Sequence, residues 1–303
     1  MVKKIIIVIM TFVVIICFYN LNSKAMNKGG YEITDINIFK DTPVWDLALA
    51  VKNQNTGNIE KIAKNKPNLL NYQEPKYGAT LLLWAVGMEK YQSAEALLKC
   101  GANPNIASTS EGETPLFCAA GYSWIDTEAK KDPKYVKLLL HYGADPNKNY
   151  IGPHGEPSGI EHGTSPLMNS IPCGIEKTKA LVEAGANINY KTELGTTAAI
   201  VALFAKEFPE HAYYLIVEKK AKVSEFYYGR FSYSDPKKHF FPVDLLRDWV
   251  FDLNSNKYKM KMEIVQEFAR QGVNYWDAKI DKYTLEHIKK LYPDTWEEYV
   301  KKY

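Results

Sequence analysis

Three histidines and one cysteine in the middle of the 303-residue chain are the side chains best suited to bind a metal ion or to transfer a proton. His141 precedes a glycine, and His154 and His162 lie in one long connection before Cys173. Zinc sites place such ligands at short, fixed spacings, which this set lacks. The sequence also has no Gly-x-Ser-x-Gly elbow, phosphate-binding glycine loop or dinucleotide fingerprint. We therefore expect no catalysis, no metal and no cofactor.

Aromatic side chains in expected loops are better suited to protein recognition than to catalysis. Tyr, Trp and Arg combine a large contact area with directed hydrogen bonds, and they recur at interface hot spots. Residues 226–233 hold five aromatic residues and one arginine, although Phe226 and Phe231 could instead fold beneath this loop. Trp84 lies on the apolar face of its expected helix and is predicted to be core. The candidate partner-binding residues are Tyr122, Trp124, Tyr150, His154, Tyr190, Tyr227, Tyr228 and Arg230.

A recurring pair of motifs predicts the helices that must position these loops. The opening motif, Gly-x-Thr-Pro-Leu or a variant of it, begins at Gly78, Gly112, Gly163 and Gly195. A closing Gly-Ala-Asn or Gly-Ala-Asp follows at Gly101, Gly143 and Gly185, and the fourth copy lacks it. The opening Thr or Ser suits a helix cap, Pro suits the first helical position, and the closing glycine suits the left-handed conformation that ends a helix.

These motifs resemble the ankyrin repeat. The second copy carries the opening Gly-Glu-Thr-Pro-Leu, the central Ala119-Ala120 and the closing Gly-Ala-Asp-Pro-Asn, and its opening lies 34 residues after the first one (78 to 112). The family period is 33 residues. The resemblance implies an all-α solenoid of about six helix-turn-helix repeats, with weaker copies at residues 47–63 and 243–274. It also implies a long surface that is presented to another macromolecule.

Insertions interrupt the period at residues 122–133, 148–159 and 226–233. Insertions in a solenoid emerge on one face and are often recruited for binding. Inside the third copy, Asn169 occupies a position that is usually apolar, so it needs an internal hydrogen-bond partner. The insertions are therefore the expected positions of partner contacts.

The first 25 residues resemble an export signal. Lys3 and Lys4 precede an apolar run over residues 5–19, and Ala25 suits signal cleavage. As a helix this run would reach only about 22 Å at about 1.5 Å per residue, against a hydrocarbon core of roughly 30 Å. The short run favours a cleaved signal. A retained membrane anchor and a lipid-modified Cys17 are the alternatives.

Removal of residues 1–25 would change both the charge and the cysteine count. The formal charge of +3 includes three lysines in that segment and no acid, so the remainder would be neutral and would carry no basic footprint for nucleic acid. Three cysteines would remain, and an odd number argues against a full disulfide framework. Cys118 is expected to be a buried thiol. A bridge between Cys100 and Cys118 stays open.

We interpret the chain as a signal or anchor (1–25), a leader (26–41), an ankyrin-repeat domain (42–274) and C-terminal capping helices (275–303). Exported ankyrin proteins of this kind resemble bacterial immunity proteins. That resemblance implies a non-catalytic module, periplasmic or inner-membrane-anchored facing the periplasm, that occludes an antibacterial toxin such as a secreted phospholipase effector. The alternatives are a periplasmic scaffold or partner of an enzyme such as catalase, and a secreted host-directed effector. The expected partner is a protein, with no nucleic acid, and with membrane contact only through an uncleaved N-terminal segment.

Overall fold

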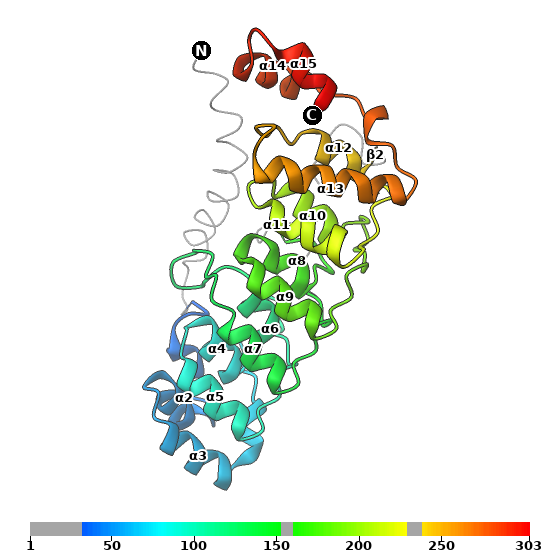
Figure 1. Cartoon of the computed structure of the whole chain (residues 1–303). Helices are drawn as coiled ribbons and strands as arrows, with labels where there is room; N and C mark the ends of the chain where they lie inside the picture. Colours follow the sequence, from blue (N-terminus) through cyan, green and yellow to red (C-terminus); the bar gives the residue numbers. More distant parts are fainter. Residues whose placement is uncertain (1–31, 153–159, 229–237) are drawn as a thin grey trace. The chain divides into compact units, whose positions relative to one another are not determined.

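The computed structural model describes residues 32–152, 160–228 and 238–303, so the expected signal at residues 1–25 lies outside the described residues. The chain divides into two compact units, one up to Ala186 and one from Asn187, and each is described by itself. Helices predominate in both units (Figure 1), as the sequence predicts. In the described part of the chain, no helix is both long enough and apolar enough to span a bilayer.

The first unit consists of helix pairs packed in series. Its elements are η1 (Ile36–Phe39), α2 (Trp45–Lys52), α3 (Thr56–Asn65), η2 (Pro67–Asn71), α4 (Leu81–Gly87), α5 (Tyr91–Lys99), α6 (Pro115–Ala120), α7 (Lys134–His141), α8 (Pro166–Ser170), η3 (Ile171–Cys173) and α9 (Ile175–Glu183). The first helices contact one another in the order α2, α4, α6, α8, and the second helices do so in the order α3, α5, α7, α9. This is the stacking predicted from the repeats. In the expected leader, η1 packs on α2 and buries Ile36 and Phe39.

The helix ends follow the predicted motifs. Thr114 caps α6 because its hydroxyl accepts the Phe117 N–H at 3.1 Å, and Pro115 is the first helical residue. Equivalent caps occur at Thr80, Ser165 and Thr197. Gly143 ends the second copy with φ 83°, a left-handed conformation that costs glycine little. The caps satisfy amide groups that would otherwise lack partners at the helix starts.

Asparagine side chains connect the closing loops of successive repeats. The Asn105 carboxamide accepts the Asp145 N–H at 2.8 Å and donates to the Gly143 carbonyl at 2.9 Å. One repeat later, Asn147 donates to the Gly185 carbonyl at 3.1 Å. These bonds fix the spacing between neighbouring repeats, since they satisfy backbone groups in irregular loops.

Two predictions about single residues in the core are confirmed. Trp84 is only 2% exposed, and its indole N–H donates to the Thr34 carbonyl at 3.2 Å. Asn169 has the internal partner it needs, because its amide donates to the Phe117 carbonyl at 3.0 Å. Both polar groups are therefore satisfied inside the packed helices.

All three cysteines of the described chain are free thiols. Cys118 and Cys173 are buried, as predicted for Cys118, and Cys100 is half-buried. The bridge left open between Cys100 and Cys118 is therefore not formed in this structure. Burial raises the pKa of the Cys118 and Cys173 thiols, so both are neutral near pH 7.

The second unit continues the helical pattern with less regular elements. They are α10 (Ala198–Phe204), α11 (Pro209–Ala212), the π-helix η4 (Tyr213–Glu218), β1 (Tyr227–Tyr228), β2 (His239–Phe240), α12 (Pro242–Arg247), α13 (Asn256–Arg270), η5 (Tyr275–Asp277), α14 (Lys282–Leu291) and α15 (Trp296–Lys302). α10 packs on α12, and α13 packs on α11 and η4. The fourth copy lacks its closing glycine, and Lys220 adopts the left-handed conformation (φ 59°) after η4. A residue with a Cβ is strained there.

A short antiparallel sheet is the one departure from the all-α expectation among the described residues. β1 pairs with β2 in the register Tyr227 to Phe240 and Tyr228 to His239. The Tyr228 N–H also donates to the Leu194 carbonyl at 2.8 Å. Short turns such as Asn-Gly or Gly-Gly are the local sequence signal for a hairpin. No such turn joins these two strands, which is why the sequence did not predict the sheet.

The C-terminal segment forms two amphipathic helices, α14 and α15, on either side of Pro293, as predicted. Ile288 and Tyr299 form a small apolar cluster that packs against Val250 and Leu253, in the segment between α12 and α13. The Tyr299 hydroxyl donates to the Phe251 carbonyl at 2.6 Å. These contacts attach the two helices to the last helix pair.

A lysine is fully buried beneath these C-terminal helices. The Lys261 side-chain nitrogen donates to the Trp249 carbonyl at 2.6 Å and lies 4.0 Å from the centre of the Tyr303 ring. The Arg247 guanidinium lies over the same ring. Desolvation, followed by the positive charge of Arg247, lowers the pKa of Lys261 to about 6, while the charge of Asp248 acts in the opposite direction.

Candidate functional site

The insertion at residues 122–133 joins α6 to α7 in the first unit and folds into a closed loop. The Ser123 N–H donates to the Glu128 carbonyl, and the Thr127 N–H donates to the Ser123 carbonyl, both at 3.0 Å. Asp126 and Lys130 form an ion pair across the same loop. Local hydrogen bonds of this kind hold an irregular segment in one conformation.

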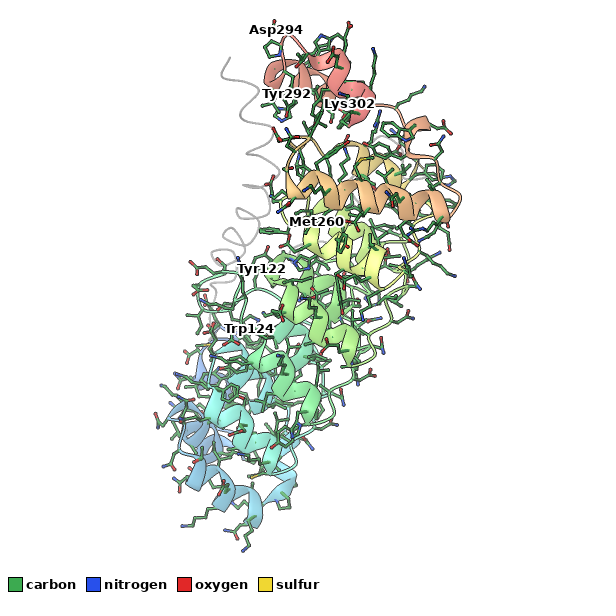
Figure 2. The ribbon with its side chains drawn as sticks, in the orientation of Figure 1. Tyr122, Trp124, Met260, Tyr292, Asp294 and Lys302 are labelled. Atoms are coloured by element: carbon green, nitrogen blue, oxygen red, sulfur yellow. The ribbon has the colours of Figure 1, made fainter. Side chains whose placement is uncertain are left out.

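The loop is attached to the preceding repeat by two contacts. The Ser123 hydroxyl donates to the Glu89 carboxylate at 2.6 Å. The Trp124 ring lies directly on the backbone of Gly87, the last residue of α4, where a Cβ would come within 2.1 Å of its Cε3 atom. Figure 2 labels Tyr122 and Trp124 on this loop. Gly87 is therefore required for close packing of the indole, and the loop is fixed across two repeats.

A half-buried acid accompanies this contact. The Trp124 indole hydrogen-bonds the Glu113 side chain, which stabilises the carboxylate. Desolvation and the charge of Glu111 act more strongly in the opposite direction and raise the pKa of Glu113 to about 7. Since a carboxyl group in bulk water ionises near pH 4, Glu113 is partly protonated in the neutral range.

One exposed aliphatic side chain and three half-buried tyrosines surround the loop. Ile125 is 55% exposed, and Tyr122 is half-buried. The rings of Tyr91 and Tyr135 meet edge to face at 5.3 Å, and the Lys134 ammonium lies 5.7 Å from the centre of the Tyr135 ring. We call these five residues, Tyr91, Tyr122, Ile125, Lys134 and Tyr135, the insertion surface. Tyrosines and an exposed aliphatic side chain are typical of protein interfaces.

Beneath the insertion surface lies a cavity of about 130 Å³. Its lining includes Gly87, Cys118, Tyr122, Trp124, Tyr135 and Lys177, and we call it the Lys177 slot. Desolvation raises the pKa of Tyr122 to about 12 and raises that of Tyr135 further, so both hydroxyls keep their protons near neutral pH. The slot therefore contains hydrogen-bond donors and one buried cation.

Lys177 projects from α9 to the end of α6. Only 3% of the residue is exposed, and its ammonium donates to the carbonyls of Ala119 at 2.8 Å, Gly121 at 3.3 Å and Ala120 at 3.5 Å. These carbonyls lie at a helix C-terminus, where the partial charge is negative. The lysine thus caps the helix that precedes the insertion.

Lys177 was not among the residues predicted from the sequence, although the repeat contains a signal for it. Residues 93, 135 and 177 each lie eight positions before a closing glycine. The Ser93 hydroxyl donates to the Val51 carbonyl at 2.6 Å, and two repeats later the Lys177 ammonium donates in the same way to the Ala119 carbonyl. This repeat position therefore reaches the end of the first helix of the preceding repeat, and a polar residue there predicts a contact with its carbonyls.

The remaining candidates in the first unit do not join the insertion surface. Tyr150 is 1% exposed and stacks on Phe117 at 5.4 Å, so the expectation that it contacts a partner is wrong for this structure. Its backbone N–H donates to the Thr164 carbonyl at 2.9 Å. His154 lies outside the described residues, and the His162 Nδ1 atom is 3.0 Å from the Gly152 carbonyl oxygen.

The candidates in the second unit are separate from those above. Tyr190 and Tyr228 are half-buried, and Arg230 lies outside the described residues. Tyr227 is only 4% exposed, so the expectation that it contacts a partner is also wrong for this structure. Phe226 is 42% exposed, so the alternative that it folds beneath this loop does not hold.

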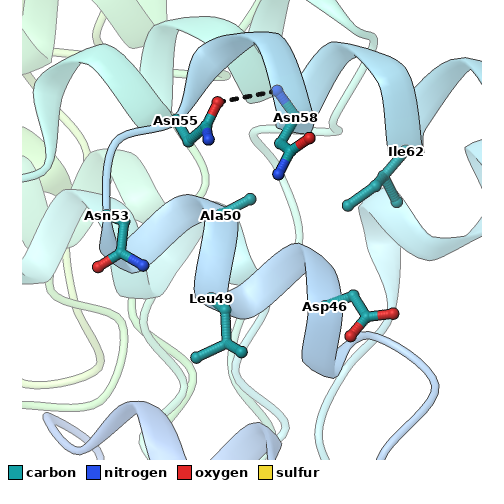
Figure 3. Close-up of a pocket in the computed structure, with 7 residues that line it drawn as sticks. All are labelled: Asp46, Leu49, Ala50, Asn53, Asn55, Asn58 and Ile62. Carbon is teal, nitrogen blue, oxygen red and sulfur yellow. Dashed lines mark hydrogen bonds between the residues drawn. The ribbon is translucent and has the colours of Figure 1, made fainter.

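A second, larger cavity lies between α2 and α3 at the start of the first unit (Figure 3). Its volume is about 390 Å³, and its lining consists of Asp46, Leu49, Ala50, Asn53, Asn55, Asn58 and Ile62. Asn55 is the N-cap of α3, and its side-chain oxygen accepts a hydrogen bond from the Asn58 N–H at 3.1 Å. With one titratable group in its lining, the cavity offers no acid and base pair.

Metal-binding side chains do not gather in the described residues. Within residues 32–152, 160–228 and 238–303, no group of three or more His, Cys, Asp or Glu side chains is arranged to hold a metal ion. Cys173, one of the four residues considered from the sequence, is a buried thiol.

Comparison with known proteins gives one family and several partial relatives. Residues 47–150 match the family model for ankyrin repeats in three copies. A putative ankyrin repeat protein of Acanthamoeba polyphaga mimivirus is 34% identical over 121 residues, which is 39% of this chain and 17% of the relative. The human ankyrin repeat and SOCS box protein 6 is 26% identical over 149 residues, covering 49% of this chain and 31% of the relative. A glycerophosphocholine phosphodiesterase of Eremothecium gossypii is 37% identical over 93 residues, covering 26% of this chain and 6% of the relative. The chain thus spans less than a third of each of these relatives.

Proposed function

Because residues 47–150 of this chain are ankyrin repeats, which are protein-binding modules, we propose that the insertion surface binds another protein without catalysis. The observation that supports this most strongly is the attachment of the loop at residues 122–133 to the preceding repeat. Ser123 and Trp124 hold it there, while Ile125 remains 55% exposed at its tip. A loop that is ordered before binding loses little conformational entropy on association.

We further propose that the partner is an antibacterial toxin and that this chain acts in the bacterial envelope as its immunity protein. The support is the sequence of residues 1–25, in which Lys3 and Lys4 precede an apolar run, as is typical of an export signal. Binding would cover the active site of the toxin, for example a secreted phospholipase effector. Such a complex needs an interface of roughly 1,600 Å² and anchors of the Tyr and Trp type.

The binding proposal is tested by two substitutions to aspartate that differ only in place. The purified chain is first used to capture its natural partner from a lysate of the cells that produce the chain. The partner is then identified and purified. Ile125→Asp is then expected to raise its Kd at least tenfold, since it puts a charge into an apolar contact. Ile151→Asp is the control, because Ile151 is 61% exposed in the same unit but lies outside the insertion surface. Equal Kd values for the two variants would reject the assignment.

The immunity proposal has its own test. The gene next to that of this chain is expressed in the periplasm of a sensitive bacterium, with and without this chain. Survival is expected only with the unmodified chain, and Ile125→Asp should restore killing. Growth without this chain, or protection that persists when its first 25 residues are deleted, would contradict an envelope immunity role. Recovery of a periplasmic enzyme such as catalase as the partner would favour the scaffold function instead.

A further inference from the structure

We propose that the Lys177 slot receives an aliphatic side chain of the bound protein, of about the size of leucine or methionine. The inference rests on the proposed binding function, and it adds the chemistry of one partner residue. Ile125 would contact the partner from the tip of the loop, and the partner would in turn insert one apolar side chain into the slot.

The charges around the slot are balanced within the chain. Lys130 forms an ion pair with Asp126, and Lys134 forms one with Asp132 at 3.4 Å, and all four side chains are partly exposed to solvent. The formal charges of the lining and of its ion-pair partners cancel, since three lysines face three acids: Lys130, Lys134, Lys177, Glu89, Asp126 and Asp132. A charged side chain of the partner would leave water without meeting an excess of opposite charge, which is unfavourable. The balance therefore favours an uncharged occupant.

Most polar groups of the slot already have partners inside the chain. The Lys177 ammonium donates to three carbonyls at the end of α6, and the Ser123 hydroxyl donates to the Glu89 carboxylate. Tyr122 also interacts within the chain. The Tyr135 hydroxyl keeps its proton and would donate to a backbone carbonyl of the partner, a group that any inserted residue brings with it. An apolar side chain thus breaks no hydrogen bond, whereas a polar one would lose water and compete for groups that are already bonded.

Apolar groups form the inner walls of the slot. Val86 and Cys118 are buried, and the thiol is uncharged because burial raises its pKa. Gly87 and Ala119 contribute little or no side chain, which leaves room between these walls. The chain already inserts one apolar ring here, since the Trp124 indole packs on Gly87. An apolar interior with a polar, solvated rim is the usual anatomy of a protein interface.

The size of the slot suits one aliphatic side chain. Its volume is about 130 Å³. A protein cavity of about 150 Å³ with apolar walls accommodates a benzene molecule. The branched four-carbon side chain of leucine and the thioether of methionine are similar in size to benzene. Removal of such a side chain from water provides the favourable free energy of binding, and a polar side chain of the same shape lacks it.

The test uses three small probes of the same branched shape, N-acetyl-leucine N-methylamide and its asparagine and aspartate analogues. They are titrated separately into the ¹⁵N-labelled chain, and the amide signals of Gly87 and Gly121 are followed by NMR. The leucine probe is expected to give saturable shifts with a Kd in the millimolar range, and the two polar probes should give none below a tenfold higher concentration. Equal shifts with all three probes, stronger shifts with the aspartate probe, or no saturable shift with the leucine probe would overturn the proposal. This comparison requires no variant.

Two variants with the same substitution refine the test. Ala119→Leu enlarges a residue of the slot lining and changes no charge, so it is expected to abolish the shifts caused by the leucine probe. Ala184→Leu, at the exposed C-cap of α9 and outside the slot lining, should retain them. Shifts that persist in Ala119→Leu would contradict the inference.

The captured partner separates this inference from the binding function. Ala119→Leu should raise the Kd of the partner at least tenfold, and Ala184→Leu should leave it unchanged. If Ile125→Asp weakens the partner and Ala119→Leu does not, the binding function stands and the apolar anchor fails. If no partner protein binds the wild type, the binding function fails, and the probe titration still decides the chemistry of the slot.

Discussion

Gly87→Ala is expected to displace Trp124 and thereby to reveal how strongly the insertion depends on the preceding repeat. A Cβ at residue 87 would lie 2.1 to 2.6 Å from three atoms of the indole, so the ring must leave its position. A tryptophan buries about 150–250 Å². For the half-buried Trp124, half of that area at about 25 cal/mol per Å² corresponds to about 2–3 kcal/mol. Alanine recovers up to about 1 kcal/mol of helix propensity. The free energy of unfolding should therefore fall by about 1–2 kcal/mol.

The assay is a double-mutant cycle, measured by urea unfolding and far-UV circular dichroism. In the Trp124→Ala background the clash is absent, and Gly87→Ala should instead stabilise the chain by up to about 1 kcal/mol. Gly57→Ala is the matched control, because its Cβ would meet only the Asn55 side chain at 3.9 Å and should stabilise both backgrounds alike. An equal effect of Gly87→Ala with and without Trp124, or stabilisation of the wild type by Gly87→Ala, would refute the predicted contact between the two residues.

Two further predictions concern pH. The pKa of Glu113 is raised in the folded chain, so the free energy of unfolding should fall as pH rises from about 4.5 to 7. Glu113→Gln should remove this fall and add about 1–3 kcal/mol to the free energy of unfolding at pH 8. An unchanged pH profile in the Gln variant would contradict this prediction. The pKa of Lys261 is lowered, so the unfolded chain binds the extra proton and stability should rise between about pH 6 and 10.5. Lys261→Met should flatten that rise and stabilise the chain at pH 7 by about 1–3 kcal/mol, as measured by thermal unfolding, and a destabilised Met variant with the rise intact would show that Lys261 remains charged.

The local part of the fold could be predicted from the sequence because its causes lie within a few residues. Thr114 and Pro115 specify the start of α6 through one hydroxyl and one ring, and Gly143 specifies the end of α7 through its backbone freedom. The small and apolar residues between these signals have helical spacing. The helix pairs and their order follow from the same motifs.

Burial of single loop residues could not be predicted in this way. Tyr150 follows a turn-rich stretch of sequence, yet its backbone pairs with Thr164 and its ring stacks on Phe117. Tyr227 is buried in a strand pair with Phe240, thirteen residues away, and no two-residue hairpin turn such as Asn-Gly links the two strands. Both outcomes depend on partners distant in sequence. The packing of Trp124 on Gly87 likewise requires the neighbouring repeat, which composition alone does not reveal.

The attachment of one loop to two repeats also limits how binding specificity can be transferred. A loop that contacted only its own helices could be grafted between α6 and α7 of any related array. Here the graft would also need a glycine at the end of α4, the first helix of the preceding repeat, and a carboxylate at position 89. Chimeras that exchange residues 81–141 as one cassette should keep their recognition properties, whereas exchange of residues 122–133 alone should lose them. Under the proposed function, the transferable unit of recognition in this chain is thus a pair of adjacent repeats.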